Sequence, residues 1–152
     1  MSDAVDELQQ AMKRAMAGRP RVGGFPYLAE CLRQAGVTRN LWALPACQSL
    51  YVTRRGTVLN AGTPLASGWA AVPRFDRDAL VKALRTDQAG ESTFPEFLAA
   101  AWRAGVVSYE VDFAERKVTY SGAGGEVYVE AYPAVSLTSA TSAPPSALGR
   151  DR

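Results

Sequence analysis

The chain has 152 residues, of which 47% are apolar, and its 17 Lys and Arg against 15 Asp and Glu give a net charge of +2. This length suits one domain with a hydrophobic core, and so small a net charge provides no strong field to attract nucleic acid or anionic lipid. No apolar run approaches the roughly 20 residues of a membrane span, and the acidic N-terminus lacks the order of a secretion signal. We therefore expect a cytoplasmic protein with no membrane or nucleic-acid partner.

The chain contains no histidine and only two cysteines. The absence of imidazole excludes Ser–His–Asp and Cys–His catalysis and zinc or iron sites that depend on histidine. Two cysteines are too few for a zinc site built from cysteine alone. We expect neither a bound metal nor a cofactor.

Four segments have the apolar spacing and terminal residues of amphipathic helices. They cover residues 3–17, 25–35, 76–89 and 94–104. The second begins with Pro26 in its first turn and ends before Gly36. The fourth is preceded by Thr93 with Glu96 three residues later, which is the pattern of a capping box.

Five segments have the pattern of strands: 48–53, 57–61, 108–113, 117–120 and 126–130. The connections at 54–56, 114–116 and 122–125 are too short for crossover helices, so the strands that they join must be antiparallel. In the last three, polar and apolar residues alternate, which predicts one face in the core and one in water. The residues expected in the core are Tyr109, Val111, Phe113, Val118, Tyr120, Val127 and Val129.

Together these elements predict a single α+β domain at 1–137, with about four helices on one side of a mainly antiparallel sheet of about five strands. Residues 138–152 are rich in Ala, Ser and Pro and predict a disordered tail. The order helix–helix–hairpin occurs twice, with one further strand at the end. Phe25-Pro26 and Phe94-Pro95 are each followed ten residues later by Ala-Gly-Val. This similarity indicates either a duplication, with a ligand or partner at the seam, or the common preferences of helix ends.

Cys47, immediately before the strand at 48–53, is the candidate catalytic residue. A nucleophilic thiolate needs a neighbouring base or cation. Arg54 and Arg55 could lower its pKa only if the fold brought them close. A buried structural cysteine fits the sequence better, and a cytoplasmic setting favours two free thiols over a Cys31–Cys47 disulfide.

Two polar loops form the candidate binding surface. Trp69 lies in the Gly- and Pro-rich segment 62–73, where an aromatic side chain can line a contact site. The segment 87–93 between two helices contributes Asp87, Gln88 and Glu91, whose polar groups and following helix N-terminus could hold an anion.

Acidic residues on the polar strand faces could act as acids and bases or bind a hard cation. A solvated sheet face with alternating cross-strand charges gives the same pattern, and we favour that interpretation. These residues are Glu110, Asp112, Glu126 and Glu130.

Four segments resemble the YdfO/YbcV-like family of bacterial and prophage proteins, some of which are labelled phage envelope protein. They are RVGGFPYL at 21–28, LPACQS at 44–49, DQAGESTFPEF at 87–97 and WRAGV at 102–106. The resemblance covers about residues 5–135. It implies an α+β domain, and it supplies no catalytic residues.

Three functions remain open. The leading hypothesis is a small non-enzymatic binding or interaction module with a protein or small-molecule partner. The first alternative is a small enzyme that uses Cys47, or a carboxylate such as Glu91, in a pocket between the helix pairs. The second, implied by the family label, is a virion-associated structural protein. An exposed sheet edge could also pair two subunits into a homodimer.

Overall fold

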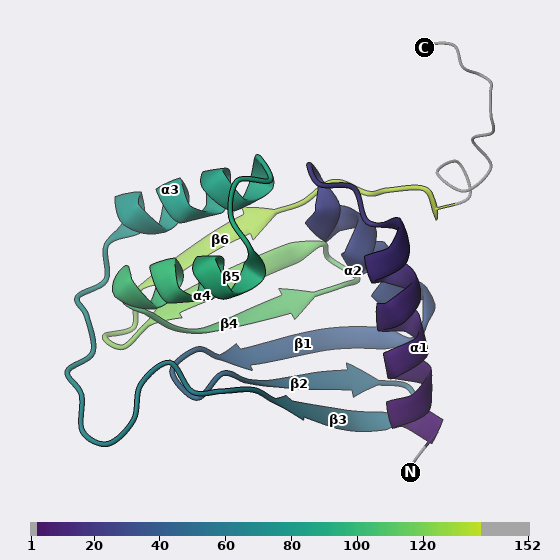
Figure 1. Cartoon of the computed structure of the whole chain (residues 1–152), viewed down its shortest axis with the longest axis horizontal. Coiled ribbons are helices and arrows are strands. Elements are labelled where there is room, and N and C mark those ends of the chain that lie inside the picture. Colours follow the sequence, from purple (N-terminus) through teal and green to yellow (C-terminus); the bar gives the residue numbers. More distant parts are fainter. Residues whose placement is uncertain (1–2, 138–152) are drawn as a thin grey trace.

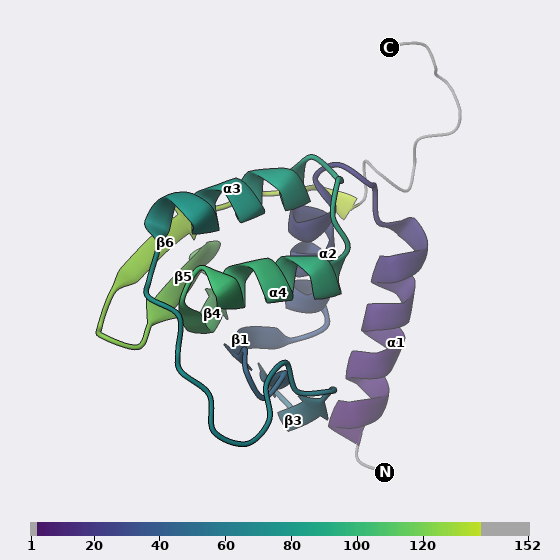
Figure 2. The same ribbon diagram turned by 60° about the vertical axis from the view of Figure 1, so that its left-hand side comes forward.

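The computed structural model describes residues 3–137, and it packs four helices against one antiparallel sheet (Figure 1). The predicted α+β class is confirmed, with six strands where about five were expected. The tail predicted at 138–152 lies outside the described residues. Figure 2 shows the helices together on one side of the sheet.

Each half of the chain has the same order of elements, two helices followed by three strands. The first half contains α1 (Asp3–Gly18), α2 (Gly24–Gln34), β1 (Val37–Ala43), β2 (Gln48–Thr53) and β3 (Gly56–Ala61). The second half contains α3 (Arg77–Gln88), α4 (Phe94–Arg103), β4 (Val106–Asp112), β5 (Lys117–Gly122) and β6 (Val127–Ala131). The strand order is β3-β2-β1-β4-β5-β6, so the two halves meet where β1 pairs with β4.

The sixth strand, which the sequence pattern does not reveal, is β1. Val37, Asn40 and Trp42 are its buried residues, and a register shift between Val37 and Arg39 breaks the alternation that a period-two pattern requires. Asn40 obscures the pattern further, because it is a polar residue that faces the core. Its side-chain amide is satisfied there by donating to the Leu50 carbonyl at 3.1 Å. With β1 in place, β6 is not an extra strand but the third strand of the second half.

The helix ends follow the predicted chemistry closely. The Thr93 hydroxyl accepts from the Glu96 backbone N–H at 3.2 Å, and the Glu96 carboxylate accepts from the Thr93 N–H at 2.8 Å, which completes the capping box. The Asp76 carboxylate caps α3 by accepting from Ala79 N–H at 3.0 Å. Gly105 follows α4 with a φ of +89°.

Aromatic side chains form the centre of the core. Trp42 packs edge-on against Phe94 of α4, with ring centroids 5.2 Å apart, and stacks on Tyr109 at 6.0 Å. Tyr109 in turn lies 5.4 Å from Tyr120 on the next strand. The β1–β4 seam is therefore held from the helix side by a row of rings that crosses it.

The facing of β6 is the reverse of the sequence prediction. Val127 and Val129 are 57% and 48% exposed on the side away from the helices. Tyr128 faces the helices, continues the aromatic row at 6.3 Å from Tyr120, and lies under the Arg77 guanidinium at 5.0 Å. Glu130 faces the same way, because α3 supplies an arginine and a glutamine to it. On an edge strand these specific partners outweigh the burial of two valines.

Candidate binding surfaces

Cys47 lies in the turn between β1 and β2, far from the two arginines that could activate it. Its φ is +52°, its backbone N–H donates to Leu44 O at 3.0 Å, and its carbonyl accepts from Gly62 N–H at 2.8 Å. Arg54 and Arg55 follow the other end of β2, which at about 3.3 Å per residue places them on the order of 20 Å away. Cys47 and Cys31 are both free thiols.

The two predicted binding loops lie at opposite ends of α3. Trp69 precedes the helix and is fully exposed, whereas Asp87 and Gln88 form the last turn and Glu91 follows it. A helix of 12 residues is about 18 Å long, and Figure 2 shows the two connections at its two ends. The structure therefore does not bring Trp69 together with the other three residues.

Asp87 and Gln88 have partners within the protein. Burial raises the pKa of Asp87, whose carboxylate accepts a 3.4 Å hydrogen bond from the Ser92 hydroxyl. The Gln88 amide donates to Glu130 at 2.6 Å, and its oxygen accepts from Arg85 at 3.0 Å. The Gln88–Glu130 contact holds the end of α3 against β6, and a ligand role for Asp87 or Gln88 stays a prediction.

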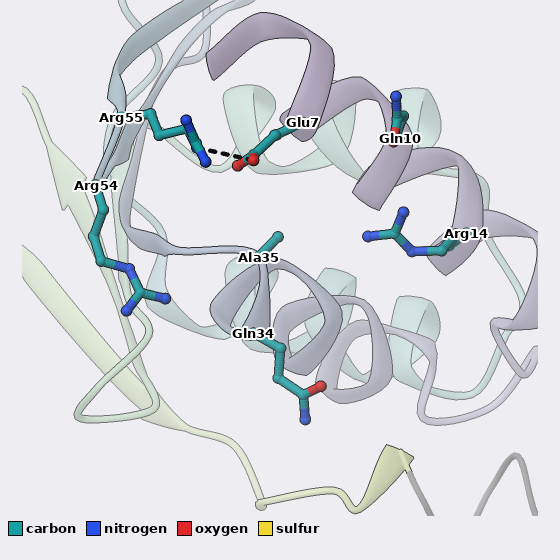
Figure 3. A pocket seen from close by; sticks show the side chains of 7 residues that line it. All are labelled: Glu7, Gln10, Arg14, Gln34, Ala35, Arg54 and Arg55. Atoms are coloured by element: carbon teal, nitrogen blue, oxygen red, sulfur yellow. Dashed lines mark ion pairs between the residues drawn. The ribbon is translucent and has the colours of Figure 1, made fainter. Parts of the chain in front are cut away.

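A groove lined by three arginines lies elsewhere, between α1, the end of α2 and the β2–β3 turn (Figure 3). Its volume is about 610 Å³. The side chains that line it are Glu7, Gln10, Arg14, Gln34, Ala35, Arg54 and Arg55. Figure 3 shows Arg14 extending from α1, and Arg54 from the turn, toward the end of α2. We call this the arginine groove.

The charges of the arginine groove are only partly balanced. Arg55 Nε donates to the Glu7 carboxylate at 2.8 Å, and the Asp3 carboxylate lies 3.8 Å from Arg55 Nη1. Neither Arg14 nor Arg54 forms an ion pair with any residue in the range 3–137. The lining therefore holds three guanidinium groups and one carboxylate, a net charge of +2.

The two arginines of the β2–β3 turn have no counterpart in the corresponding turn of the second half. The β5–β6 turn, which corresponds to the β2–β3 turn, contains Ala123, two glycines and Glu126 in place of two arginines. Because a turn without cations joins its strands equally well, Arg54 and Arg55 are not needed to form the hairpin. The adjacent arginines are visible in the sequence, but only the fold shows that Arg14, 40 residues earlier, joins them.

The face of the sheet away from the helices is uncovered, and we call it the open face. Three rows of side chains run across its six strands in register. The middle row contains Leu59, Leu50, Leu41, Glu110, Thr119 and Val129 in strand order. A shallow polar depression of about 330 Å³ lies over β1, β4 and β5. Apolar residues therefore flank a polar centre.

Three mycobacterial proteins are similar to the chain over most of its length. They are Rv2012 and MT2067 of Mycobacterium tuberculosis and Mb2035 of Mycobacterium bovis, each described as uncharacterised. Each is 56% identical over 135 residues, which is 89% of this chain and 82% of the relative. The chain belongs to their family. No family model matches the chain.

At 56% identity the mycobacterial proteins share this fold, but their descriptions name no activity. The function must therefore be inferred from the surfaces described above. Within residues 3–137, no helix is both long and apolar enough to cross a membrane. The same residues contain no group of three or more His, Cys, Asp or Glu side chains placed to hold a metal ion.

Proposed function

We propose that the protein is a small non-enzymatic binding module, and that the arginine groove holds a small ligand with at least two negative charges. The observation that carries this proposal is the pair of guanidinium groups, Arg14 and Arg54, that face one groove without an ion-pair partner among the described residues. Guanidinium groups bind phosphate and carboxylate oxygens through two parallel hydrogen bonds. A dianion would neutralise the net charge of the lining.

The size and lining of the groove favour a small polar ligand. Its volume of about 610 Å³ is within the range of metabolite sites, but its side chains are mostly charged or amide-bearing, so an apolar molecule gains little there. Gln10 adds an amide group that can donate to or accept from a ligand, whereas the Gln34 amide nitrogen donates to the Glu30 carboxylate at 3.0 Å and leaves its oxygen as an acceptor. A phosphate ester or a di- or tricarboxylate fits this chemistry.

The charge balance of the groove favours binding over turnover. Glu7 is the only carboxylate in the lining, and its ion pair with Arg55 leaves it poorly placed to serve as a general base. The enzyme hypothesis based on Cys47 gains no support from the distance to Arg54 and Arg55. Membership of the YdfO/YbcV-like family and a virion role stay predictions, because the relatives found carry no functional description.

Calorimetric titration with pyrophosphate and with citrate at low ionic strength tests the proposal. We expect saturable binding to the wild type, and a loss of about tenfold or more in affinity for Arg14→Gln and for Arg54→Gln, since a hydrogen bond to a charged group contributes about 1.5–3 kcal/mol. Binding should weaken as salt is added.

Lys13→Gln is the matched control, because it removes one positive charge from the neighbouring position of α1, outside the groove. Its affinity should stay within about twofold of the wild type, since exposed charges at a distance are screened. Equal losses of affinity in Lys13→Gln and Arg14→Gln would show that anion binding depends only on the overall charge of the protein, and not on the groove. Absence of heat with both anions would reject the groove as an anion site.

A further inference from the structure

We infer that the open face packs against the open face of a second copy of this chain, about a twofold axis parallel to the strands. The result is a four-layer dimer with the two sheets inside and the helices outside. This inference is independent of the arginine groove, whose residues lie on α1, at the end of α2 and in the β2–β3 turn.

The open face exposes apolar side chains on both flanks. Leu59 on β3 is 58% exposed and Leu50 on β2 is 41% exposed, while Val127 and Val129 on β6 are 57% and 48% exposed. The strand register aligns them with Leu41 and Val52 on the same face. Exposed apolar surface gathered in this way on one face of a sheet is typical of an interface.

The charges at the centre of the open face indicate the kind of partner. Arg39 forms an ion pair with Glu110 at 3.2 Å, and Asp112 lies opposite Lys117 in the strand register. Two cations and two carboxylates cancel, so the face attracts neither a polyanion nor an anionic membrane. A suitable partner presents both signs in a matching order, and a second copy does so.

A twofold axis parallel to the strands keeps the three rows of the two faces in line. It places each residue opposite the one at the same distance across the β1–β4 seam, so that Leu59 meets Val129 of the partner subunit at the flanks and Leu41 meets Glu110 of the partner subunit near the axis. It also places Arg39 opposite Asp112 of the partner subunit. An axis perpendicular to the strands would instead bring Glu110 against Glu110 of the partner subunit, a like-charge contact that disfavours that arrangement.

The polar centre need not be dehydrated in this dimer. The depression of about 330 Å³ lies over Glu110, Asp112 and Lys117, and two facing depressions enclose room for water between the sheets. Bridging water can satisfy charged groups at an interface with little loss of affinity. The apolar contacts then lie on the two flanks, outside this hydrated centre.

The area available is that of a modest specific dimer. Six strands about 4.8 Å apart and about five residues long cover roughly 500 Å² per copy, or about 1,000 Å² for the pair. This figure treats each face as a plane and leaves out the area that protruding side chains add. Specific interfaces begin near 1,000–1,200 Å². We therefore expect a dimer that dissociates on dilution.

Sedimentation velocity of the full chain over a wide concentration range tests the inference. The wild type should pass from monomer to dimer with increasing concentration, while Leu59→Arg and Val129→Glu should each weaken self-association at least tenfold. Both side chains are about half exposed, so the folded monomer should tolerate these changes. Val22→Arg is the matched control, because Val22 is 56% exposed outside the sheet.

A mixture of the two variants tests the axis itself. In a heterodimer, the introduced guanidinium and the introduced carboxylate would meet at one flank and the unchanged leucine and valine at the other. Mixing Leu59→Arg with Val129→Glu should therefore restore the dimer. A wild type that stays monomeric at about 1 mM would overturn the inference, as would a dimer unaffected by either variant. Single variants that dissociate but do not complement each other would overturn the proposed axis.

Discussion

Leu41 of β1 lies directly opposite Glu110 of β4 in the strand register. The two residues are also equivalents in the two halves, because the Phe-Pro pairs that begin at Phe25 and Phe94 and the strand starts at Val37 and Val106 are both 69 residues apart. A residue that pairs with its own equivalent must lie beside the symmetry axis. The pseudo-twofold axis therefore passes between Leu41 and Glu110, and the repeated order of elements favours the duplication interpretation over common helix-end preferences.

The same pair shows how the halves have diverged. On the open face, Leu41 continues into Leu50 and Leu59, whereas Glu110 continues into Thr119. The middle row is thus apolar through the first half, whereas in the second half it is apolar only at Val129. In the arrangement inferred above, Leu41 therefore faces Glu110 of the partner subunit near the axis, and the apolar contacts are those between Leu59 and Val129 at the flanks.

The contact between α3 and β6 should make stability depend on pH. Burial alone would raise the pKa of Glu130, but hydrogen bonds from Arg85, Tyr128 and Gln88 outweigh it and hold its pKa below the usual value. A lowered folded-state pKa stabilises the protein above the unfolded-state pKa of about 4.3, and this contribution is lost as the pH falls through the folded-state value.

We therefore expect Glu130→Gln to lower the free energy of unfolding by about 1–2 kcal/mol at pH 7, because it removes a charge that three groups stabilise. The difference from wild type should shrink as the pH falls through the lowered folded-state pKa, because protonation removes the charge. Urea titrations at pH 7 and at a series of lower pH values measure it. Glu115→Gln, at an exposed ion pair with Lys117, should change stability by less than about 0.5 kcal/mol; a Glu130 effect independent of pH would contradict this account.

Gly105 should tolerate no side chain. Its φ is +89°, and a Cβ there would lie 2.5 Å from the Phe75 Cα, which is backbone and cannot move aside cheaply. We expect Gly105→Ala to cost about 3 kcal/mol, from left-handed strain together with overpacking. Gly23→Ala is the control, since Gly23 has a φ of +72° with nothing within 4 Å of a Cβ, and it should cost about 1 kcal/mol. Equal costs in denaturant titrations would show that the close approach to Phe75 has no effect.

Cys31 offers an independent measure of charge near the arginine groove. Burial raises the pKa of the Cys31 thiol, and the positive charge of Arg14 opposes this shift in part. In a Cys47→Ser background, Cys31 should therefore react with iodoacetamide more slowly at pH 7.5 than a free cysteine does. Arg14→Gln should slow it further, by moving the pH profile of the rate upward, while Lys13→Gln should not. An unchanged profile in Arg14→Gln would mean that the guanidinium does not act on this thiol.

Local sequence signals determine which parts of the fold can be predicted. Thr93, Glu96 and Asp76 act on neighbouring backbone groups, so their roles are readable from spacing alone. The facing of Val129 cannot be read in this way. It depends on the contact of the next residue, Glu130, with Arg85 of α3, which lies more than 40 residues earlier in the chain. The arginine groove escapes prediction for the same reason, since its cations on α1 and in the β2–β3 turn become neighbours only through the packing of α1 on the sheet.

Substitution of Trp69 tests whether self-association uses the loop at 62–73 or the open face. Because its side chain is fully exposed, Trp69→Ala should change the free energy of unfolding by less than about 0.5 kcal/mol. Trp42→Ala, which empties the centre of the core, should cost about 3–5 kcal/mol. Trp69→Ala should also dimerise like the wild type, as the loop that contains Trp69 contributes nothing to the open face. If this variant were monomeric while Leu59→Arg still formed dimers, the contact surface would be the loop at 62–73 and not the sheet.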